Sequence, residues 1–318
     1  MDHVGSILGA ASYYVVFEVQ PKDGKPQVIA TLREKAEERS SNGFRLMLEL
    51  AKNLGEQDPV YKIFTQQIGQ AQSMVKIETD GNAARSQYDI ASKLYNGRYV
   101  EIDGFKFSFD STSLTDSGPR FRLMEKAKGL HFNDLPEDTA EQKIFKKNLA
   151  KAYVTLEFYI ILMGGEFDHD RHGYQMKVDG TEVRLFDHGA MSLHAPSTED
   201  RKLLADVLFE GFERMQRGES IQTFLTNTVR QRAEAGTPSE YITTIQKGLL
   251  ALSDYLRHMS ANDIKLALQS AIQAGLEDGT LHSDLIEQAM MKAEAGGFSS
   301  GALSCQGEVI KIGQRLSK

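Results

Sequence analysis

Three polar residues in one short interval have the types and the spacing that phosphoryl transfer requires. Asp170 is followed five residues later by Gln175, and twelve residues beyond that by Asp187. In this chemistry one carboxylate orients the nucleophile, while an amide and a second carboxylate hold Mg²⁺ across the phosphates. Two strand-like pieces, YQMKV and EVRLF, are joined by Asp179-Gly180 between Gln175 and Asp187. We expect this hairpin to bring the two halves of the site together.

The same interval is rich in histidine, which opens an alternative. Neutral imidazole and carboxylate groups bind zinc or iron, so a transition-metal centre could form here. Its candidate ligands are Asp168, His169, His172, His188 and His194. These histidines lack the i, i+4 helical spacing of zincins, which speaks against this alternative. The plainest interpretation is a solvated loop whose carboxylates only end a turn.

Composition describes an ordinary globular protein. The chain has 318 residues, 41% of them hydrophobic, and 37 basic against 44 acidic residues give a net charge of −7. These values exclude a disordered chain and argue against binding to nucleic acid. The single cysteine, Cys305, excludes a disulfide framework and a Cys-based zinc site. We therefore expect a cytoplasmic protein.

No stretch of the sequence is typical of secretion or of a membrane span. The N-terminus has no basic region followed by an apolar stretch. The most apolar run, Ala152 to Gly165, is shorter than the ~20 residues of a span and contains Glu157. We expect this run to form a buried helix.

The first part of the chain alternates strands and helices. Residues 12–33 hold two β-rich runs, YYVVFEV and QVIATL, on either side of Asp23-Gly24, which predicts a hairpin. The patterns then predict three helices, from Glu34 to about Gly55, over 59–75 and over 82–94. A strand pair over 98–109 that turns at Asp103-Gly104 follows, then a loop at SLTDSGPR and a strand over 120–126.

The second part is mostly helical. Its predicted helices cover about 139–163, 199–216, 220–234, 238–258, 261–276 and 283–294, and 296–301 is predicted to be a loose tail. The exception is the hairpin around Asp179-Gly180. This order predicts an α+β protein of two lobes, with a β-rich lobe over 1–127 and a helical lobe over 128–318 that contains the hairpin.

The segment around Asp170 and Asp187 resembles the catalytic region of the UbiB-type (AarF-domain) atypical kinase-like family. Protein kinases use Asp-x-x-x-x-Asn followed by Asp-Phe-Gly, and in this family Asp-x-His-x-x-Asn precedes Asp-Phe-Gly-Ala. Three further pieces match in order: the alanine-rich nucleotide loop (Gly9-Ala10-Ala11-Ser12), a Glu-x-Asp segment (Glu78-Thr79-Asp80), and the connector between lobes (Leu123 to Gly129). The resemblance covers roughly residues 8–195.

The resemblance implies a two-lobed protein-kinase-like fold that binds ATP with Mg²⁺ or Mn²⁺ between the lobes. Asp170 would be the catalytic carboxylate, and Gln175 and Asp187 would hold the metal. The residues implied to contact the nucleotide are Gly9, Ala10, Ala11 and Ser12 at the phosphates, Thr31 on the following strand, and Met124, Glu125, Lys126 and Ala127 at the adenine.

Three supporting residues also come from the resemblance. Glu78 and Asp80 would act near the phosphates, although carboxylates at this place also suit the start of the next helix. His172 would brace the catalytic loop by hydrogen bonding.

The sequence departs from the family at several positions. In place of the Val-Ala-x-Lys strand it has Val28-Ile29-Ala30-Thr31, so the phosphate-binding lysine is missing. Gln175 replaces asparagine, and His188 replaces the packing phenylalanine. The substitutes considered for the lysine are Lys25, Arg33 and Lys35. We also expect the family's Lys-x-Gly-Gln extension, which restrains protein-kinase activity, to be missing before the nucleotide loop.

Two functions stay open. The resemblance implies an ATPase or a transferase acting on a small molecule or lipid of quinone or isoprenoid metabolism. The missing lysine instead suits a pseudokinase that binds a nucleotide or a partner. A plain helical scaffold is a third alternative. Expected partners are a nucleotide and an unknown small-molecule, lipid or protein substrate, with no nucleic acid and no transmembrane segment; a peripheral membrane contact is compatible with both functions.

Overall fold

The computed structural model describes residues 4–10, 13–21, 24–164, 168–191, 247–280 and 310–315, with 214, 217–220, 223 and 227. Five strands form the first sheet, in the spatial order β1-β2-β3-β7-β6 with every pair antiparallel. Their bounds are β1 (Val4–Ala10), β2 (Tyr14–Val19), β3 (Gln27–Leu32), β6 (Leu114–Gly118) and β7 (Phe121–Glu125).

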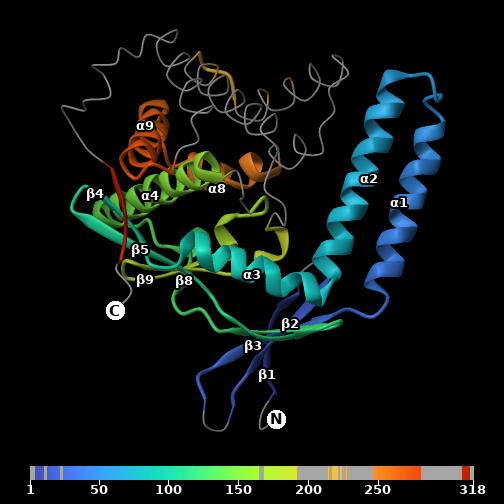
Figure 1. Ribbon diagram of the computed structural model, residues 1–318, viewed down its shortest axis with the longest axis horizontal. Coiled ribbons are helices and arrows are strands. Elements are labelled where there is room, and N and C mark those ends of the chain that lie inside the picture. The colour runs from blue at the N-terminus through green and yellow to red at the C-terminus, as the bar shows by residue number, and fades with distance from the viewer. Residues whose placement is uncertain are drawn as a thin grey trace.

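Three helices accompany this sheet: α1 (Ala36–Lys52), α2 (Pro59–Thr79) and α3 (Gly81–Tyr95). Figure 1 shows α1 and α2 as an antiparallel pair that rises away from the sheet. The α3 helix contacts β6 and β7 of the first sheet and β5 of the second. It therefore links the two halves of the molecule.

The second sheet has the order β11-β4-β5-β10-β9-β8, and only the β5–β10 pair is parallel. Its strands are β4 (Arg98–Ile102), β5 (Phe105–Ser111), β8 (Leu130–His131), β9 (Met176–Asp179), β10 (Glu182–Leu185) and β11 (Lys311–Gln314). The β4–β5 hairpin precedes residue 127 in the sequence but pairs with β10 and β11. The expected boundary at 127 thus leaves this hairpin on the wrong side in space.

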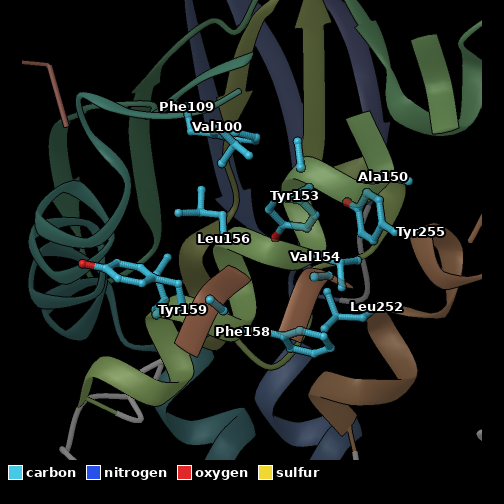
Figure 2. Packing of buried hydrophobic residues seen from close by; sticks show 14 of the residues in the cluster. Val100, Phe109, Ala150, Tyr153, Val154, Leu156, Phe158, Tyr159, Leu252 and Tyr255 are labelled. Carbon is cyan, nitrogen blue, oxygen red and sulfur yellow. The ribbon is translucent and has the colours of Figure 1, made fainter. Parts of the chain in front are cut away.

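The main core surrounds α4 (Ala140–Gly164), which packs against α9 (Ala261–Glu277) and α8 (Ser253–Leu256). Figure 2 shows Val100 and Phe109 of the second sheet on one side of α4, and Leu252 and Tyr255 on another. The rings of Tyr153 and Tyr255 lie 4.6 Å apart. Because partners cover it on several sides, the part of α4 from Ala152 onward is apolar nearly all round, as a buried helix should be. In the part of the chain that the structure describes, no helix combines the length and the apolarity of a membrane span.

The predicted two-lobed α+β fold is confirmed: an antiparallel sheet with helices precedes a part that contains α4, α8, α9 and the β9–β10 hairpin. The predicted strands and helices between residues 13 and 164, the hairpin at Asp179-Gly180 and the helix at 261–276 are all present. The loop predicted at SLTDSGPR is wrong, because β6 forms there by pairing with β7. The strands β1 and β11 were not predicted.

Several predictions fall on other parts of the chain. The predicted helix at 283–294 and the tail at 296–301 lie outside the described residues. Those at 199–216 and 220–234 do so except for single residues, and within 238–258 only the residues from 247 onward are described, as helix and turn. His194 and Cys305 are also outside the described residues.

A buried carboxyl group lies inside the α4 core. Glu157 is 1% exposed, and the Tyr95 hydroxyl donates a hydrogen bond of 2.8 Å to its Oε1. Burial raises the pKa of Glu157 to about 7, against the opposing effects of Arg171 and of the Tyr95 hydrogen bond. The core therefore prefers this side chain protonated.

We expect Glu157→Gln to change how stability depends on pH. The raised pKa means that the wild-type contribution is complete below the unfolded value of about 4.5 and is lost as the pH rises to about 7. Glutamine does not titrate, so the variant should gain roughly 3 kcal/mol relative to wild type between pH 4.5 and pH 8. Urea unfolding across this range measures the gain. The exposed Glu182→Gln is the control, and a difference that stays flat with pH would contradict the prediction.

Candidate functional site

The hairpin places the two halves of the predicted site side by side. Asp170 lies in the loop after α4, and Gln175 ends a 3-10 turn at Gly173–Gln175. The strands β9 and β10 pair from Asp179↔Glu182 to Met176↔Leu185, and the Phe186 N–H donates to the Gln175 carbonyl at 3.2 Å. Gln175 Nε2 donates to Asp170 Oδ2 at 3.4 Å.

Asp187 has an unusual backbone. Its φ of 57° and ψ of 64° lie in the left-handed region, which a residue with a side chain rarely adopts and which is common at functional sites. Solvent reaches the Asp187 side chain. The surrounding protein still desolvates it and raises its pKa, while Arg122 opposes the shift and Asp168 and Asp170 add to it.

Arg171 holds both sides of Asp187 in place. One amino group, Nη1, donates to the Phe186 carbonyl at 2.7 Å, just before Asp187. The other, Nη2, donates to Asp168 Oδ2 and lies 2.7 Å from His188 Nδ1, just after Asp187. Arg171 and Asp168 are both almost completely buried. This ion pair therefore fixes the catalytic loop and the Asp187 backbone with one planar group.

His188 is a neutral packing residue. Because a guanidinium only donates, Nδ1 of His188 must accept and its proton is on Nε2. Burial lowers the pKa of His188 to about 4, in agreement with the neutral form. Its ring meets Tyr88 of α3 edge-on at 4.8 Å. His188 thus packs against α3. It stands at the position where the family has a packing phenylalanine.

The α3 helix is also hydrogen-bonded to this segment. Gln87 Nε2 donates to the Gly189 carbonyl at 2.6 Å, and both residues are buried. The position of α3 and that of the Asp187-His188-Gly189 segment are therefore coupled.

The loop that carries Asp170 has two further supports. Asp254 of α8 accepts from the Gly173 N–H at 2.9 Å and from Asn133 Nδ2 at 3.0 Å. His172 Nδ1 accepts from the Tyr174 N–H at 3.2 Å, within the same loop. A Cβ on Gly173 would lie 2.4 Å from Asn133 Oδ1, so a larger residue there would displace the Asn133 side chain.

Glu78 and Asp80 have different roles. Asp80 caps α3, because its side chain accepts from the Asn82 N–H at 2.8 Å. Its contact is therefore the one expected of a carboxylate at the start of the next helix. Glu78 faces the site from the last turn of α2. Burial raises its pKa to about 7, with Asp187 and Asp170 adding to the effect and Lys247 opposing it. Glu78 is thus a third carboxyl group near Asp187 and Asp170.

The strand β3 presents Ala30 and Leu32, and not Thr31, to the interior. Ala30 pairs with Arg122 and Leu32 with Tyr14, and the Arg122 guanidinium lies over the Tyr14 ring at 4.8 Å. Since side chains alternate along a strand, Thr31 lies on the opposite face, where its hydroxyl donates to the Val15 carbonyl at 3.3 Å. The expectation that Thr31 marks the lysine position therefore needs correcting, and the inward position is Leu32.

The nucleotide loop is described only in part. Gly9 and Ala10 end β1, and Ala10 pairs with Val15 across the turn to β2. Ala11 and Ser12 lie outside the described residues. Among the described residues that are not its chain neighbours, none has an atom within 4 Å of the position that a Cβ on Gly9 would take.

The connector joins β7 to β8. Met124 and Glu125 end β7, and Lys126 and Ala127 follow it without regular structure. Lys126 Nζ forms an ion pair of 2.6 Å with Glu18 of β2. The Tyr88 hydroxyl donates to Met124 Sδ, which ties the start of the connector to α3.

Three residues at the site were missed in the sequence, namely Arg122, Lys247 and Asp254. Lys247 Nζ lies 3.4 Å from Asp170 Oδ1. Arg122 had a readable signal, since it shares the inward phase of the alternating segment RFRLMEK with Met124. Lys247 and Asp254 had none, because only the fold brings them to the loop. Of the residues considered as substitutes for the lysine, Lys25 and Lys35 are exposed.

Hard oxygen donors are available for a divalent metal ion. Gln175 Oε1 is buried without a hydrogen-bond partner among the described residues, and Asp187 is reached by solvent. Amide and carboxylate oxygens are the ligands that Mg²⁺ and Mn²⁺ accept, so the residues present fit such an ion. Over the described ranges, no group of three or more His, Cys, Asp or Glu side chains is arranged to bind a metal.

No protein-family model and no curated protein matches the chain. Among solved structures, it is similar to Rv3197 of Mycobacterium tuberculosis in complex with erythromycin, at 17% identity and a TM-score of 0.47 over 66% of this chain and 50% of that one. The chain thus spans half the length of the Rv3197 chain.

Two protein kinases are similar over more of their length. The PknI kinase domain of Mycobacterium tuberculosis has 13% identity and a TM-score of 0.32 over 92% of this chain and 95% of that one. The MAP kinase LmaMPK10 of Leishmania major has 12% identity and a TM-score of 0.31 over 99% of this chain and 88% of that one.

We expect Arg171→Met to destabilise the protein strongly. It leaves the Asp168 carboxylate buried without its cation, which typically costs about 3–5 kcal/mol. Arg184→Met is the matched control, because Arg184 pairs with Asp110 at 3.7 Å near the surface and should cost less than about 1 kcal/mol. Urea unfolding measures both. Adding Asp168→Asn to Arg171→Met should recover part of the loss. Equal costs for the two arginine variants would contradict the assignment of Arg171 as the central support.

Proposed function

We propose that this chain is an ATP-binding atypical kinase or ATPase of the UbiB type, which transfers the terminal phosphoryl group of ATP or hydrolyses it with Mg²⁺ or Mn²⁺. The observation that supports this most is the juxtaposition of Asp170, Gln175 and Asp187. The first two are hydrogen-bonded, and Arg171 contacts the residues on either side of the third.

Asp170 is the proposed catalytic carboxylate. Its side chain is 37% exposed and pairs with Lys247, so an acceptor hydroxyl or a water molecule can reach it. It would orient that group and accept its proton. Lys247 forms an ion pair with this carboxylate, with its Nζ 3.4 Å from Asp170 Oδ1.

Gln175 and Asp187 are the proposed metal ligands. A bound divalent ion would neutralise charge that develops on the transferring phosphoryl group. Arg171 would not contact the nucleotide or the metal ion. Its role is to fix the backbone on either side of Asp187. Glu78 adds a third carboxyl group near this ion.

The nucleotide is proposed to lie between the connector and the β1–β2 turn. Met124, Glu125, Lys126 and Ala127 would meet the adenine, and backbone N–H groups of Gly9, Ala10, Ala11 and Ser12 would meet the phosphates. The acceptor is proposed to be a small molecule or lipid linked to quinone or isoprenoid metabolism, on the strength of the family resemblance.

A pseudokinase is the alternative. It is favoured by the strand β3, whose inward positions carry Ala30 and Leu32 in place of a lysine. Such a protein would keep the nucleotide cleft as a binding site and would regulate a partner.

We expect Asp187→Ala to abolish metal-dependent nucleotide binding. A ligand at a hundred times its Kd stabilises the folded state by about 2.7 kcal/mol, which a thermal-shift titration with ATP and Mg²⁺, Mn²⁺ or EDTA detects. The wild type should shift with metal and not with EDTA. Asp179→Ala, on the exposed turn of the same hairpin, should behave as the wild type. Equal shifts for wild type and Asp187→Ala would refute the metal assignment.

We expect Asp170→Asn to separate the enzyme from the pseudokinase. Loss of a general base typically lowers turnover by about 10²–10⁴-fold, while the amide keeps the size of the side chain and its contact with Gln175. ATP consumption and ATP affinity are measured together. An enzyme should lose turnover and keep affinity within a few fold. Binding without turnover in the wild type would favour the pseudokinase.

A further inference from the structure

The strand β7 carries a buried cation toward the site. Arg122 is 3% exposed and pairs with Ala30 of β3, on the inward face of the first sheet. Its guanidinium covers the Tyr14 ring at 4.8 Å. It thus occupies the layer of the sheet from which a strand lysine would reach the phosphates.

The surroundings of Gly189 show which groups Arg122 meets. A Cβ placed on Gly189 would lie 3.0 Å from Arg122 Nη1, 3.4 Å from Glu78 Cγ and 3.6 Å from Asp187 Oδ1. The guanidinium and the proposed metal ligand Asp187 therefore border the same small space. Arg122 also lowers the pKa of both Asp187 and Glu78, which agrees with its closeness to them.

The hydrogen bonds of Arg122 are incomplete. Nη2 donates to the main-chain oxygen of Glu78, which also accepts from the Tyr14 hydroxyl at 3.0 Å. The Arg122 Nε is buried without a partner among the described residues. No carboxylate in the described ranges forms an ion pair with Arg122. A buried guanidinium with a free N–H and no paired anion is costly unless a ligand completes it.

From this placement we infer that Arg122 binds the phosphate groups of a nucleoside di- or triphosphate, in place of the missing strand lysine. The inference rests on the proposed nucleotide-binding function and adds its phosphate-binding residue. A guanidinium suits this role because its donors match phosphate oxygens in pairs. A positive charge from Arg122 also explains how the site stays positively charged although the inward residues of β3, Ala30 and Leu32, carry no charge.

The test compares ligands that differ only in phosphate. Isothermal titration gives the affinities of ATP, ADP and adenosine, each with Mg²⁺, for the wild type, Arg122→Met and Arg122→Lys. A charge-assisted hydrogen bond is worth a factor of about 10–100 in affinity. Arg122→Met should lose that factor for ATP and ADP and keep its affinity for adenosine, and Arg122→Lys should lose less. Arg120→Gln, at an exposed turn of the same hairpin, should match the wild type.

Two added variants keep the test decisive if Arg122→Met is unstable. In the Arg122→Lys background, Leu32→Lys should strengthen ATP binding because its position faces inward, and Thr31→Lys should not. Unchanged ATP affinity in Arg122→Met, or an equal loss for adenosine, would overturn the role of Arg122 and leave the proposed function intact. A wild type that binds neither ATP nor ADP would overturn both.

Discussion

The geometry of the site depends on one buried ion pair, between Arg171 and Asp168. The guanidinium reaches the catalytic loop through Asp168 and the strand end through the Phe186 carbonyl, and it also meets His188. Asp168 in turn accepts from the Asp170 N–H at 3.0 Å. Asp170 and Asp187 are therefore placed relative to one another by a single rigid group. Such a pair contributes little net stability, because its desolvation is costly, and its value is that it permits only one arrangement.

The α3 helix extends this arrangement to the rest of the molecule. It binds the Asp187-His188-Gly189 segment through Gln87 and Tyr88, and it binds the connector through the contact between Tyr88 and Met124. Tyr95, at its other end, reaches Glu157 in the α4 core. A displacement of α3 must therefore change the site, the connector and the core together.

Features that depend on residues close in the sequence were predicted. Contacts between segments that are distant in the sequence were not predicted. The Asp179-Gly180 hairpin and the α4 helix are local signals, and both predictions are confirmed. The spacing of Asp170, Gln175 and Asp187 is also a local signal, and the site assigned to it stays a prediction. Arg122 and Lys247 act beside carboxylates 65 and 77 residues away from them in the sequence, Asp187 and Asp170 respectively, and no periodicity reports such a contact. The prediction that Thr31 occupies the lysine position was wrong for a related reason. A motif can be aligned one residue out, and in a strand that shift moves the side chain to the other face.

The charged side chains around Asp187 explain how the site can keep positive charge although the strand lysine is missing. Glu78, Asp170 and Asp187 bring up to three negative charges, and Arg122 and Lys247 bring two positive ones. A polyphosphate alone would be repelled by such a cluster, whereas a polyphosphate with a divalent ion would not. One of these cations, Arg122, lies on β7, and the other, Lys247, lies 3.4 Å from Asp170 Oδ1. Positive charge at the site is thus kept, but it comes from different elements than the one that the family pattern uses.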